Sequence, residues 1–257
     1  MFNFNQHLNA LRTALQFLTI FPVGRLTSQE QSTTGLSLLY YPLVGLLLGF
    51  VLAVFAWFAQ SALNIYSVQL FLLAGLVLAL WVMLTGALHL DGLADCADAW
   101  MGGLGNKQRT LALMKDPTSG PIAVTVMVLS LLLKFTALLA LLQYASLWML
   151  LIAPFVARLS VLVLLLVTPY VRPQGLGEVL SKHFPRQEAK VVVAVAVILF
   201  LFLNFSGAMS VLVMAAVTLV LLRTMMMSRL KGCTGDTLGA TIEIVEVVSL
   251  VTLAALL

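Results

Sequence analysis

Charged residues are scarce in this chain of 257 residues: Asp, Glu, Lys and Arg together make up only 9% of it. An ordinary soluble domain carries about 25% of these residues. Hydrophobic residues make up 61% of the chain, and its mean hydropathy is +1.08. Because a water-soluble fold could not bury so much apolar surface, the sequence predicts an all-α integral membrane protein with one polytopic domain over residues 1–257.

Cysteine and histidine are also scarce, with two and three residues respectively. Cys96 and Cys233 each lie in a polar motif and not in the disulfide-dense pattern of small secreted domains, so we expect both to be reduced. These residues are too few for a convincing zinc or iron site. The first residues also lack the basic and apolar segments of a cleavable signal peptide, so we expect the first span to direct membrane insertion.

Long apolar runs predict about seven transmembrane helices, since a helix of about 20 residues crosses a bilayer. The fifth and sixth runs are short, and they could form a tight hairpin around residues 204–207 or be partly re-entrant. No fixed-period repeat occurs, which argues against a solenoid. The predicted spans cover approximately residues 35–59, 68–89, 120–142, 147–168, 190–204, 208–222 and 238–257.

A short amphipathic helix is predicted over residues 6–20, ahead of the first span. Leucines recur there at helical spacing, and Arg12 and Gln16 fall outside that stripe. We expect this interfacial helix to lie on the membrane surface. The stripe consists of Leu8, Leu11, Leu15 and Leu18, together with Ala14.

The basic residues predict the orientation of the chain. If the N-terminus is cytoplasmic, the loops near residues 60–67, 143–146 and 204–207 lie outside, and none of them contains a charged residue. Only Lys134 and Arg158 then lie within spans. The excess of basic residues on the cytoplasmic side is what the positive-inside rule expects. This dispersed pattern reflects membrane topology and does not indicate binding to nucleic acid. The other basic residues lie inside: Arg12, Arg25, Lys107, Arg109, Lys115, Arg172, Lys182, Arg186, Lys190, Arg223, Arg229 and Lys231.

The acidic residues follow a different pattern, because seven of the ten fall into three short motifs at the predicted cytoplasmic surface. The first motif covers residues 89–98, where aspartates at i, i+4 and i+7 share one face of a helix. The second covers residues 114–120, and the third covers residues 232–246. Their acidic residues are Asp91, Asp95, Asp98, Asp116, Asp236, Glu243 and Glu246.

Carboxylates crowded at a membrane boundary need a positive partner, because an unpaired charge in a low-dielectric setting is costly. Mg²⁺ fits this role, since it prefers oxygen ligands and commonly binds one or two protein carboxylates together with substrate phosphates. Glycines in the motifs would let the backbone approach a phosphate closely, and a helix opening near residue 239 would direct its amides there. These glycines are Gly92, Gly232, Gly235 and Gly239.

Structural roles remain open for the same residues. Asp91 and Asp236 could cap the helices that follow them, and Asp95 and Asp98 could line a solvated face. Lys115 could bind a phosphate, or it could be basic only because it lies on the cytoplasmic side.

Glu243 and Glu246 lie inside an apolar segment, where ionisable residues are costly and usually functional. They could instead pair with Lys134 or Arg158 in a purely structural role. His89 could carry a proton or contact a phosphate, or it could be a satisfied residue at the end of a span.

The order and spacing of the three motifs resemble one known family, the cobalamin synthases, or adenosylcobinamide-GDP ribazoletransferases. The resemblance covers essentially the whole chain. It rests on HLDGLADCAD at residues 89–98, on MKD with Gly120 in the second motif, and on TGDTLGA at residues 234–240 with two glutamates behind. Family members often carry Ser-Arg after the aspartate of the second motif, where this chain has Pro117-Thr118. A phosphate contact from that arginine is therefore not implied.

The resemblance implies a Mg²⁺-dependent transferase that joins α-ribazole or its 5′-phosphate to adenosylcobinamide-GDP and releases GMP. It also implies a multi-pass protein of the bacterial cytoplasmic (inner) membrane with a cytoplasmic active face, and it leaves a homo-oligomer open. The expected metal ligands are Asp91 and Asp95, with Asp98 and Asp236 as further ligands or as the base for the hydroxyl. The catalytic candidates are His89, Asp91, Asp95, Asp98 and Asp236. The substrate-binding candidates are Lys115, Asp116, Gly120, Thr234, Gly235, Glu243 and Glu246.

Two other classes of membrane protein share part of this pattern. A CDP-alcohol phosphotransferase also places aspartates at a membrane face, but its D-x-x-D-G-x-x-A-R signature is absent here, since Leu88 stands three residues before Asp91. An ion-coupled secondary transporter could use Glu243, Glu246 and Lys134 to carry an ion. Transport predicts acids near the midplane of the membrane, whereas most acids here lie at one predicted surface.

Overall fold

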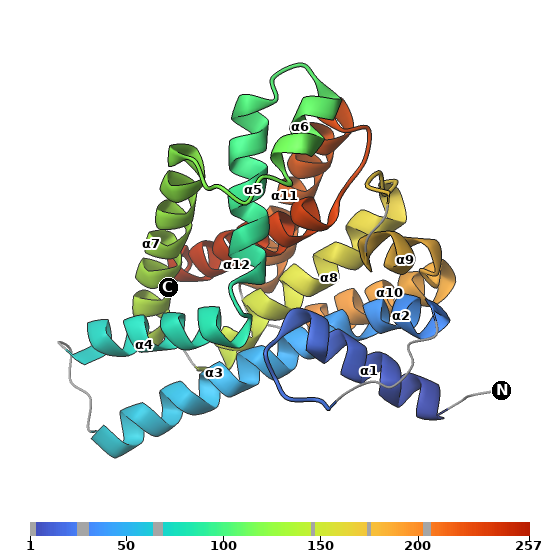
Figure 1. Cartoon of the computed structure of the whole chain (residues 1–257). Helices are drawn as coiled ribbons and strands as arrows, with labels where there is room; N and C mark the ends of the chain where they lie inside the picture. Colours follow the sequence, from blue (N-terminus) through green and yellow to red (C-terminus); the bar gives the residue numbers. More distant parts are fainter. Residues whose placement is uncertain (1–3, 25–30, 64–68, 145–146, 174–175, 203–206) are drawn as a thin grey trace.

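The structure is a computed structural model, and it describes residues 4–24, 31–63, 69–144, 147–173, 176–202 and 207–257. Within these residues every regular element is helical, which confirms the predicted all-α fold, and one isolated parallel bridge joins Tyr170 to Cys233. The α-helices are labelled in Figure 1. The elements are α1 (Phe4–Leu18), α2 (Gln31–Ser37), η1 (Leu38–Tyr40), α3 (Tyr41–Leu63), α4 (Gln69–Leu84), α5 (Leu88–Gly102), α6 (Lys107–Leu113), α7 (Pro121–Tyr144), η2 (Leu147–Leu151), α8 (Ile152–Val167), α9 (Leu176–Lys182), α10 (Arg186–Phe202), α11 (Ala208–Arg229) and α12 (Gly235–Ala255).

Five helical segments in the described part of the chain are long and apolar enough to cross a membrane, and a bent pair of helices would make a sixth. The predicted count of about seven is therefore not confirmed. The expected span over residues 190–204 corresponds to α10, which has 17 residues and is not among the five. Residues 204–206 of the predicted hairpin lie outside the described residues. The five segments are Gln31–Ala62, Pro121–Tyr144, Leu147–Val167, Ala208–Arg229 and Gly235–Ala255.

The expected continuous span over residues 68–89 is broken by a corner. α4 and α5 are separated by a short break, and their axes differ in direction by 85°. Gly86 and Ala87 both adopt left-handed backbone conformations there, with φ of +58° and +56°. Hydropathy gives no sign of this corner, because Ala87 is apolar and alanine rarely adopts positive φ. Because of this corner, α5, which carries the first acidic motif, runs almost perpendicular to α4 (Figure 1).

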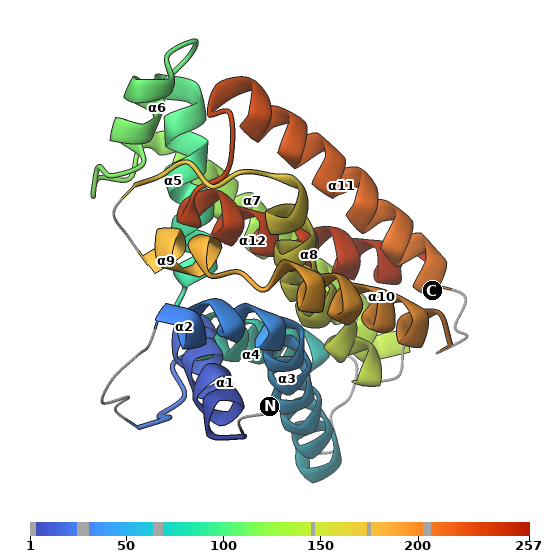
Figure 2. The same ribbon diagram turned by 90° about the vertical axis from the view of Figure 1, so that its right-hand side faces the viewer.

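α12 lies at the centre of the helical packing, in contact with α5, α7, α8 and α11. α8 is the most buried of the five candidate spans, whereas α11 is the least buried. α9 packs against α2 on the side shown in Figure 2. Three of the four neighbours of α12, namely α5, α7 and α8, come from the middle of the sequence.

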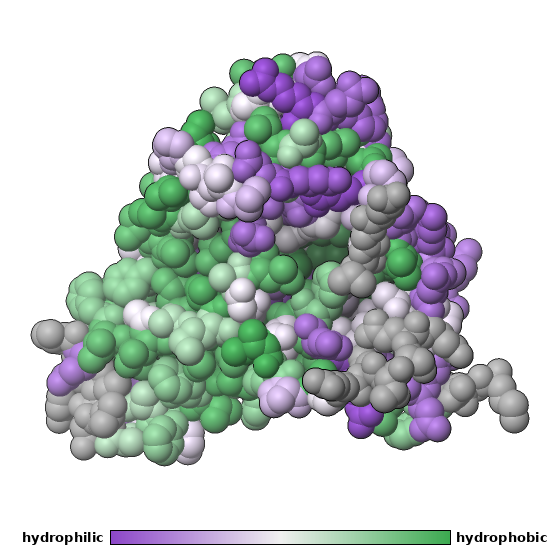
Figure 3. Space-filling model, in the orientation of Figure 1, coloured by the Kyte–Doolittle hydropathy of each residue, from purple (hydrophilic) through white to green (hydrophobic). Residues whose placement is uncertain are grey.

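Hydrophilic and hydrophobic residues occupy different parts of the surface (Figure 3). Hydrophilic residues gather over α6 and the segment that joins it to α7, and hydrophobic residues cover the face formed by α3, α4 and α7. This division suits a protein that is embedded in lipid on one part of its surface and exposed to water on another. The cytoplasmic orientation of the N-terminus stays a prediction.

The predicted amphipathic helix is present as α1. Ala14 and Leu18 are buried, and Arg12 and Gln16 are exposed, as the leucine stripe predicts. The buried side packs on α2, η1 and α3, so much of the apolar face covers other helices. Its location at the membrane interface stays a prediction.

Candidate active site

α5 and α12 cross at two glycines. A Cβ atom added at Gly92 would lie 2.8 Å from the backbone oxygen of Asp236, and one added at Gly239 would lie 3.7 Å from the Cα atom of Gly92. A larger residue at Gly92 would therefore push the two helices apart. These glycines bring the first and third motifs together by helix packing, whereas the sequence alone suggests close approach to a phosphate.

A capping box fixes the first turn of α12. The Oγ1 atom of Thr234 accepts a hydrogen bond from the N–H of Thr237 at 3.3 Å, and the Oγ1 atom of Thr237 accepts one from the N–H of Thr234 at 2.8 Å. Thr234, a predicted substrate contact, is fully buried in this cap. Its side chain orders the turn that carries Asp236, so Thr234 and not Asp236 caps the helix.

The segment before α9 pairs with the segment before α12. The N–H of Val171 donates to the carbonyl oxygen of Cys233 at 2.9 Å, and the N–H of Cys233 donates to that of Pro169 at 2.8 Å. The hydroxyl of Tyr170 lies close to Gly235, another predicted substrate contact, since a Cβ atom added at Gly235 would be 4.0 Å from it. Burial raises the pKa of Tyr170 above its ordinary value, so the phenol stays neutral at physiological pH.

Arg172 supplies a positive charge among the acidic motifs. Its Nη1 atom donates to Oδ2 of Asp236 at 2.6 Å, and its Nη2 atom donates to the carbonyl oxygen of Met114 at 3.3 Å. Arg172 thereby joins the second motif to the third. The sequence alone did not predict this role. The positive-inside rule already explains a basic residue at this position, and Arg172 and Asp236 do not belong to a common motif.

Asp98 joins the first motif to the second. Its Oδ2 atom accepts a hydrogen bond from the N–H of Gly120 at 2.5 Å, and its Oδ1 atom accepts one from the N–H of Ala123 at 3.0 Å. These amides lie at the start of α7, where Pro121 has no N–H and the helix dipole favours a negative charge. Asp98 therefore caps α7 and does not line a solvated face, and its role as a metal ligand stays a prediction.

Asp91 and Asp95 are the carboxylates of α5 that the fold leaves available, because neither has a hydrogen bond or ion pair among the described residues. Asp95 lies within electrostatic range of Asp91, Asp98, Asp236 and Arg172. The described residues contain no group of three acidic, histidine or cysteine side chains that could hold a metal ion. Two carboxylates on successive helical turns fit Mg²⁺, which takes further ligands from water and substrate phosphates. They do not form a metal cage made of protein ligands alone.

Lys115 and Asp116 of the second motif are exposed on the segment between α6 and α7. The Oδ1 atom of Asp116 accepts hydrogen bonds from the Thr118 hydroxyl at 2.6 Å and from its backbone N–H at 3.0 Å. These bonds lower the pKa of Asp116 below its ordinary value, so it is ionised at neutral pH. Contact of either residue with a substrate stays a prediction.

Glu243 and Glu246 belong to a buried ionic cluster that joins α7, α8 and α12. The Nζ atom of Lys134 lies 2.8 Å from Oε1 of Glu243 and 2.5 Å from Oε2 of Glu246, and Arg158 pairs with the other oxygen of Glu246. The hydroxyl of Ser130 donates to Glu243 at 2.9 Å. These contacts correspond to the structural interpretation of the two glutamates. The two acidic and two basic side chains balance in charge, which gives the transporter alternative no support.

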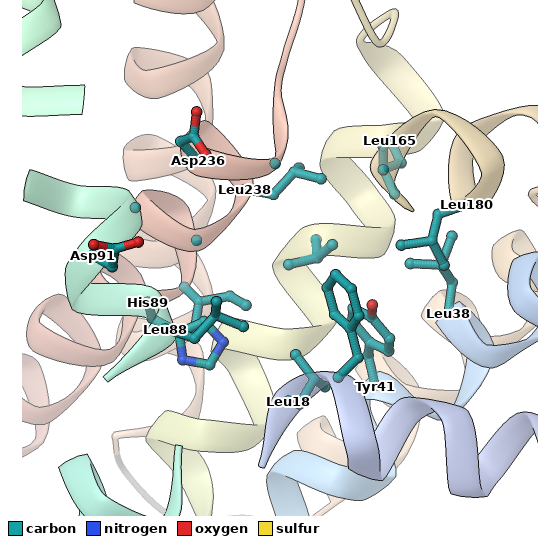
Figure 4. A pocket seen from close by; sticks show the side chains of 17 residues that line it. Leu18, Leu38, Tyr41, Leu88, His89, Asp91, Leu165, Leu180, Asp236 and Leu238 are labelled. Carbon is teal, nitrogen blue, oxygen red and sulfur yellow. The ribbon is translucent and has the colours of Figure 1, made fainter. Parts of the chain in front are cut away.

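A cavity of about 200 Å³ lies beside the crossing of α5 and α12 (Figure 4). Most of its wall is apolar, and His89 forms part of it. Asp91 and Asp236 lie on one side of this cavity, opposite Leu38 and Leu180. The cavity therefore places an apolar space next to the carboxylates of two motifs.

The fold and this site define an all-α membrane enzyme whose acidic motifs meet where two helices cross. The model of the cobalamin-5-phosphate synthase family matches residues 10–254, so the chain belongs to this family. It is 51% identical over 244 residues to the adenosylcobinamide-GDP ribazoletransferase of Stutzerimonas stutzeri, with 95% of this chain and 97% of that protein covered.

A second relative has the same name. The adenosylcobinamide-GDP ribazoletransferase of Pseudomonas aeruginosa is 48% identical over 250 residues, with 96% of this chain and 98% of that protein covered. No solved structure matches the chain. The family resemblance carried by the three motifs is confirmed.

Proposed function

We propose that this protein is a cobalamin synthase that joins α-ribazole, or its 5′-phosphate, to adenosylcobinamide-GDP and releases GMP. The names of its relatives supply the two substrates. The observation that carries the proposal is the assembly of all three acidic motifs around the start of α12, through Gly92, Asp98 and Arg172. Phosphoryl transfer depends mainly on such positioning of charge around the reacting phosphates.

The proposed reaction exchanges one phosphorus–oxygen bond for another. A ribose hydroxyl oxygen bonds to the phosphorus next to the cobinamide arm, and the phosphoanhydride bond breaks, so GMP leaves with the electron pair. The hydroxyl proton passes to a carboxylate. Asp98 is engaged by two backbone amides, whereas Asp236 lines the cavity, and its ion pair with Arg172 uses only Oδ2. We assign Asp236 as the base on this ground.

Mg²⁺ belongs to the proposal as the cofactor. Asp91 and Asp95 would hold it together with phosphate oxygens of the substrate, because these two carboxylates have no protein partner among the described residues. When bound, it would neutralise negative charge on the reacting phosphates. Lys115 is exposed on the segment between α6 and α7 and would add a further positive charge.

The location also belongs to the proposal. The candidate spans indicate a multi-pass membrane protein, and we place it in the bacterial inner membrane with the acidic motifs on the cytoplasmic side. The hydrophilic surface over α6 and the following segment supports one water-exposed side for these motifs (Figure 3).

The Asp91→Asn variant tests the metal assignment in purified protein reconstituted in lipid. We expect kcat/KM for GMP release to fall roughly 100-fold, the usual scale for loss of one electrostatic contact to the transition state. A higher Mg²⁺ concentration should be needed for half-maximal rate. Glu188→Gln, at an exposed position of α10 far from the motifs in sequence, is the matched control and should behave as wild type.

Two results would contradict the proposal. Unchanged activity and Mg²⁺ dependence in Asp91→Asn would exclude Asp91 as a metal ligand. Wild-type protein that forms neither cobalamin nor its phosphate from both substrates and Mg²⁺, as judged by mass spectrometry, would exclude the function itself.

A further inference from the structure

Two side chains in the wall of the cavity carry a buried polar atom that has no partner among the described residues. Tyr41 and His89 both line the cavity, and neither the hydroxyl of Tyr41 nor the Nε2 atom of His89 forms a hydrogen bond there. Each side chain is only 3% exposed. Buried polar groups in folded proteins are nearly always hydrogen-bonded. A ligand bound in the cavity is one source of a partner for these two atoms.

The rest of the cavity wall is largely apolar. Phe17 and Leu18 come from α1, Leu38 comes from η1, and Val161 and Leu165 come from α8. The volume of about 200 Å³ is smaller than the roughly 300–1,000 Å³ of sites that enclose a whole drug-sized ligand. Such a space suits one flat ring system that carries few polar atoms.

The carboxylates on one side of the cavity indicate what the ring is attached to. Asp91 and Asp236 both line the cavity and are labelled in Figure 4. A ligand with its ring in the apolar part would hold a polar substituent beside these two aspartates. A nucleoside has this composition, because a flat base is joined to a ribose that carries hydroxyl groups.

On the basis of the proposed function, we propose that this cavity binds the heterocyclic base of the nucleoside substrate, with the Tyr41 hydroxyl as the polar contact of its ring. A benzimidazole nucleoside has one ring nitrogen with a free lone pair, to which the Tyr41 hydroxyl donates. The rest of its ring edge is apolar and matches the leucine, valine and phenylalanine side chains. Guanine carries polar atoms around its whole edge, and in the apolar part of the cavity most of them would lack partners, while a corrin ring is far larger than the cavity.

Tyr41→Phe is the first test, because it removes one oxygen atom and keeps the ring. With full-length protein in lipid, equilibrium dialysis should show a Kd for the nucleoside about tenfold higher, the scale of one lost hydrogen bond. The KM for adenosylcobinamide-GDP should stay the same. A nucleoside analogue with C–H in place of the free ring nitrogen should bind wild type and variant equally. If Tyr41→Phe raises the Kd of the nucleoside and of this analogue equally, the proposed hydrogen bond from Tyr41 to the ring nitrogen is overturned.

Leu88→Phe is the second test and fills the cavity from its edge. Leu88 lines the cavity but is 44% exposed, so a larger side chain is accommodated at little cost to folding. We expect the Kd for the nucleoside to rise at least about tenfold. Leu104→Phe is the matched control, because Leu104 is 67% exposed and is not part of the cavity wall. Wild-type binding in Leu88→Phe would exclude the cavity as the base site.

The wild-type reaction separates this inference from the proposed function. If wild type releases GMP and both variants bind the nucleoside as wild type does, the cavity assignment fails and the function stands. If wild type releases no GMP from the two substrates, the proposed function fails, and the cavity assignment fails with it.

Discussion

The guanidinium group of Arg172 lies 2.6 Å from the carboxylate of Asp236, although the two residues are 64 positions apart in the chain. Both side chains are about one-fifth exposed, at 19% and 18%, so solvent screens much of the attraction between them. The main effect of the pair is on position. It ties the segment before α9 to the first turn of α12, beside the cavity and the other acidic motifs.

Arg172→Gln should lower the activity more than the stability. The substitution leaves Asp236 without its charged partner and removes the Nη2 atom that donates to the carbonyl oxygen of Met114. We expect kcat/KM for GMP release to fall about tenfold, a change of about 1.4 kcal/mol in transition-state stabilisation. Arg109→Gln, at an exposed position of α6, is the control. Equal rates for the two variants would contradict a positioning role for Arg172.

Gly92→Ala should separate α5 from α12. The added Cβ would lie 2.8 Å from the backbone oxygen of Asp236, which belongs to the backbone and cannot rotate away. We expect the unfolding free energy to fall by about 1–3 kcal/mol, the usual cost of overpacking, and GMP release to fall with it. At Gly75 the nearest atom would be 3.9 Å away, so Gly75→Ala should be tolerated. Thermal unfolding in detergent compares the two variants, and similar midpoints would contradict the close crossing.

Asp98→Ala should destabilise the start of α7. The carboxylate accepts hydrogen bonds from the N–H groups of Gly120 and Ala123, which would otherwise lose their partner. We expect a loss of about 1 kcal/mol in unfolding free energy, as for other helix caps. Asp98→Asn keeps one acceptor and should lose less. A variant with wild-type stability but an altered Mg²⁺ requirement would instead make Asp98 a metal ligand.

The two buried glutamates should differ in their effect on stability. Glu246→Gln leaves Arg158 without a carboxylate, and breaking a buried ion pair costs about 3–5 kcal/mol. Glu243→Gln should cost less, because Lys134 still pairs with Glu246. Denaturant unfolding measures both variants. A stable Glu246→Gln protein with a raised KM would favour the substrate-binding role that the sequence leaves open.

Cys233 should be unreactive in the folded protein. Its side chain is fully buried, and burial raises the pKa of the thiol from 9.0 to about 12. The thiol therefore stays protonated between pH 7 and pH 9, where the reactive thiolate would otherwise increase. In a Cys96→Ser background, a maleimide reagent should label the protein only after denaturation. Labelling of the folded protein that rises across this pH window would contradict the burial of Cys233.

The acidic motifs could be predicted from the sequence because their members are close together in the chain. Asp91 and Asp95 are one helical turn apart, so their common face follows from helix geometry alone. The contacts that complete the site could not be predicted. Arg172 lies next to Asp236 because the backbone just before Arg172 pairs with that of Cys233. Tyr41 lines the cavity, but it belongs to a helix whose sequence indicates only an apolar span.

Composition and local spacing by themselves determined that this is an all-α membrane protein, which acidic motifs it carries and which family those motifs resemble. Composition and spacing are local properties, since hydropathy is summed over neighbouring residues and the spacing of a motif lies within a single helix. The tertiary structure alone decided the corner at Ala87, the crossing at Gly92 and Gly239, the cap from Asp98 to α7 and the buried pairing of Glu246. The corner is a backbone conformation that hydropathy does not indicate, and the other three features depend on contacts between separate helices, for which apolar sequence carries no local signal.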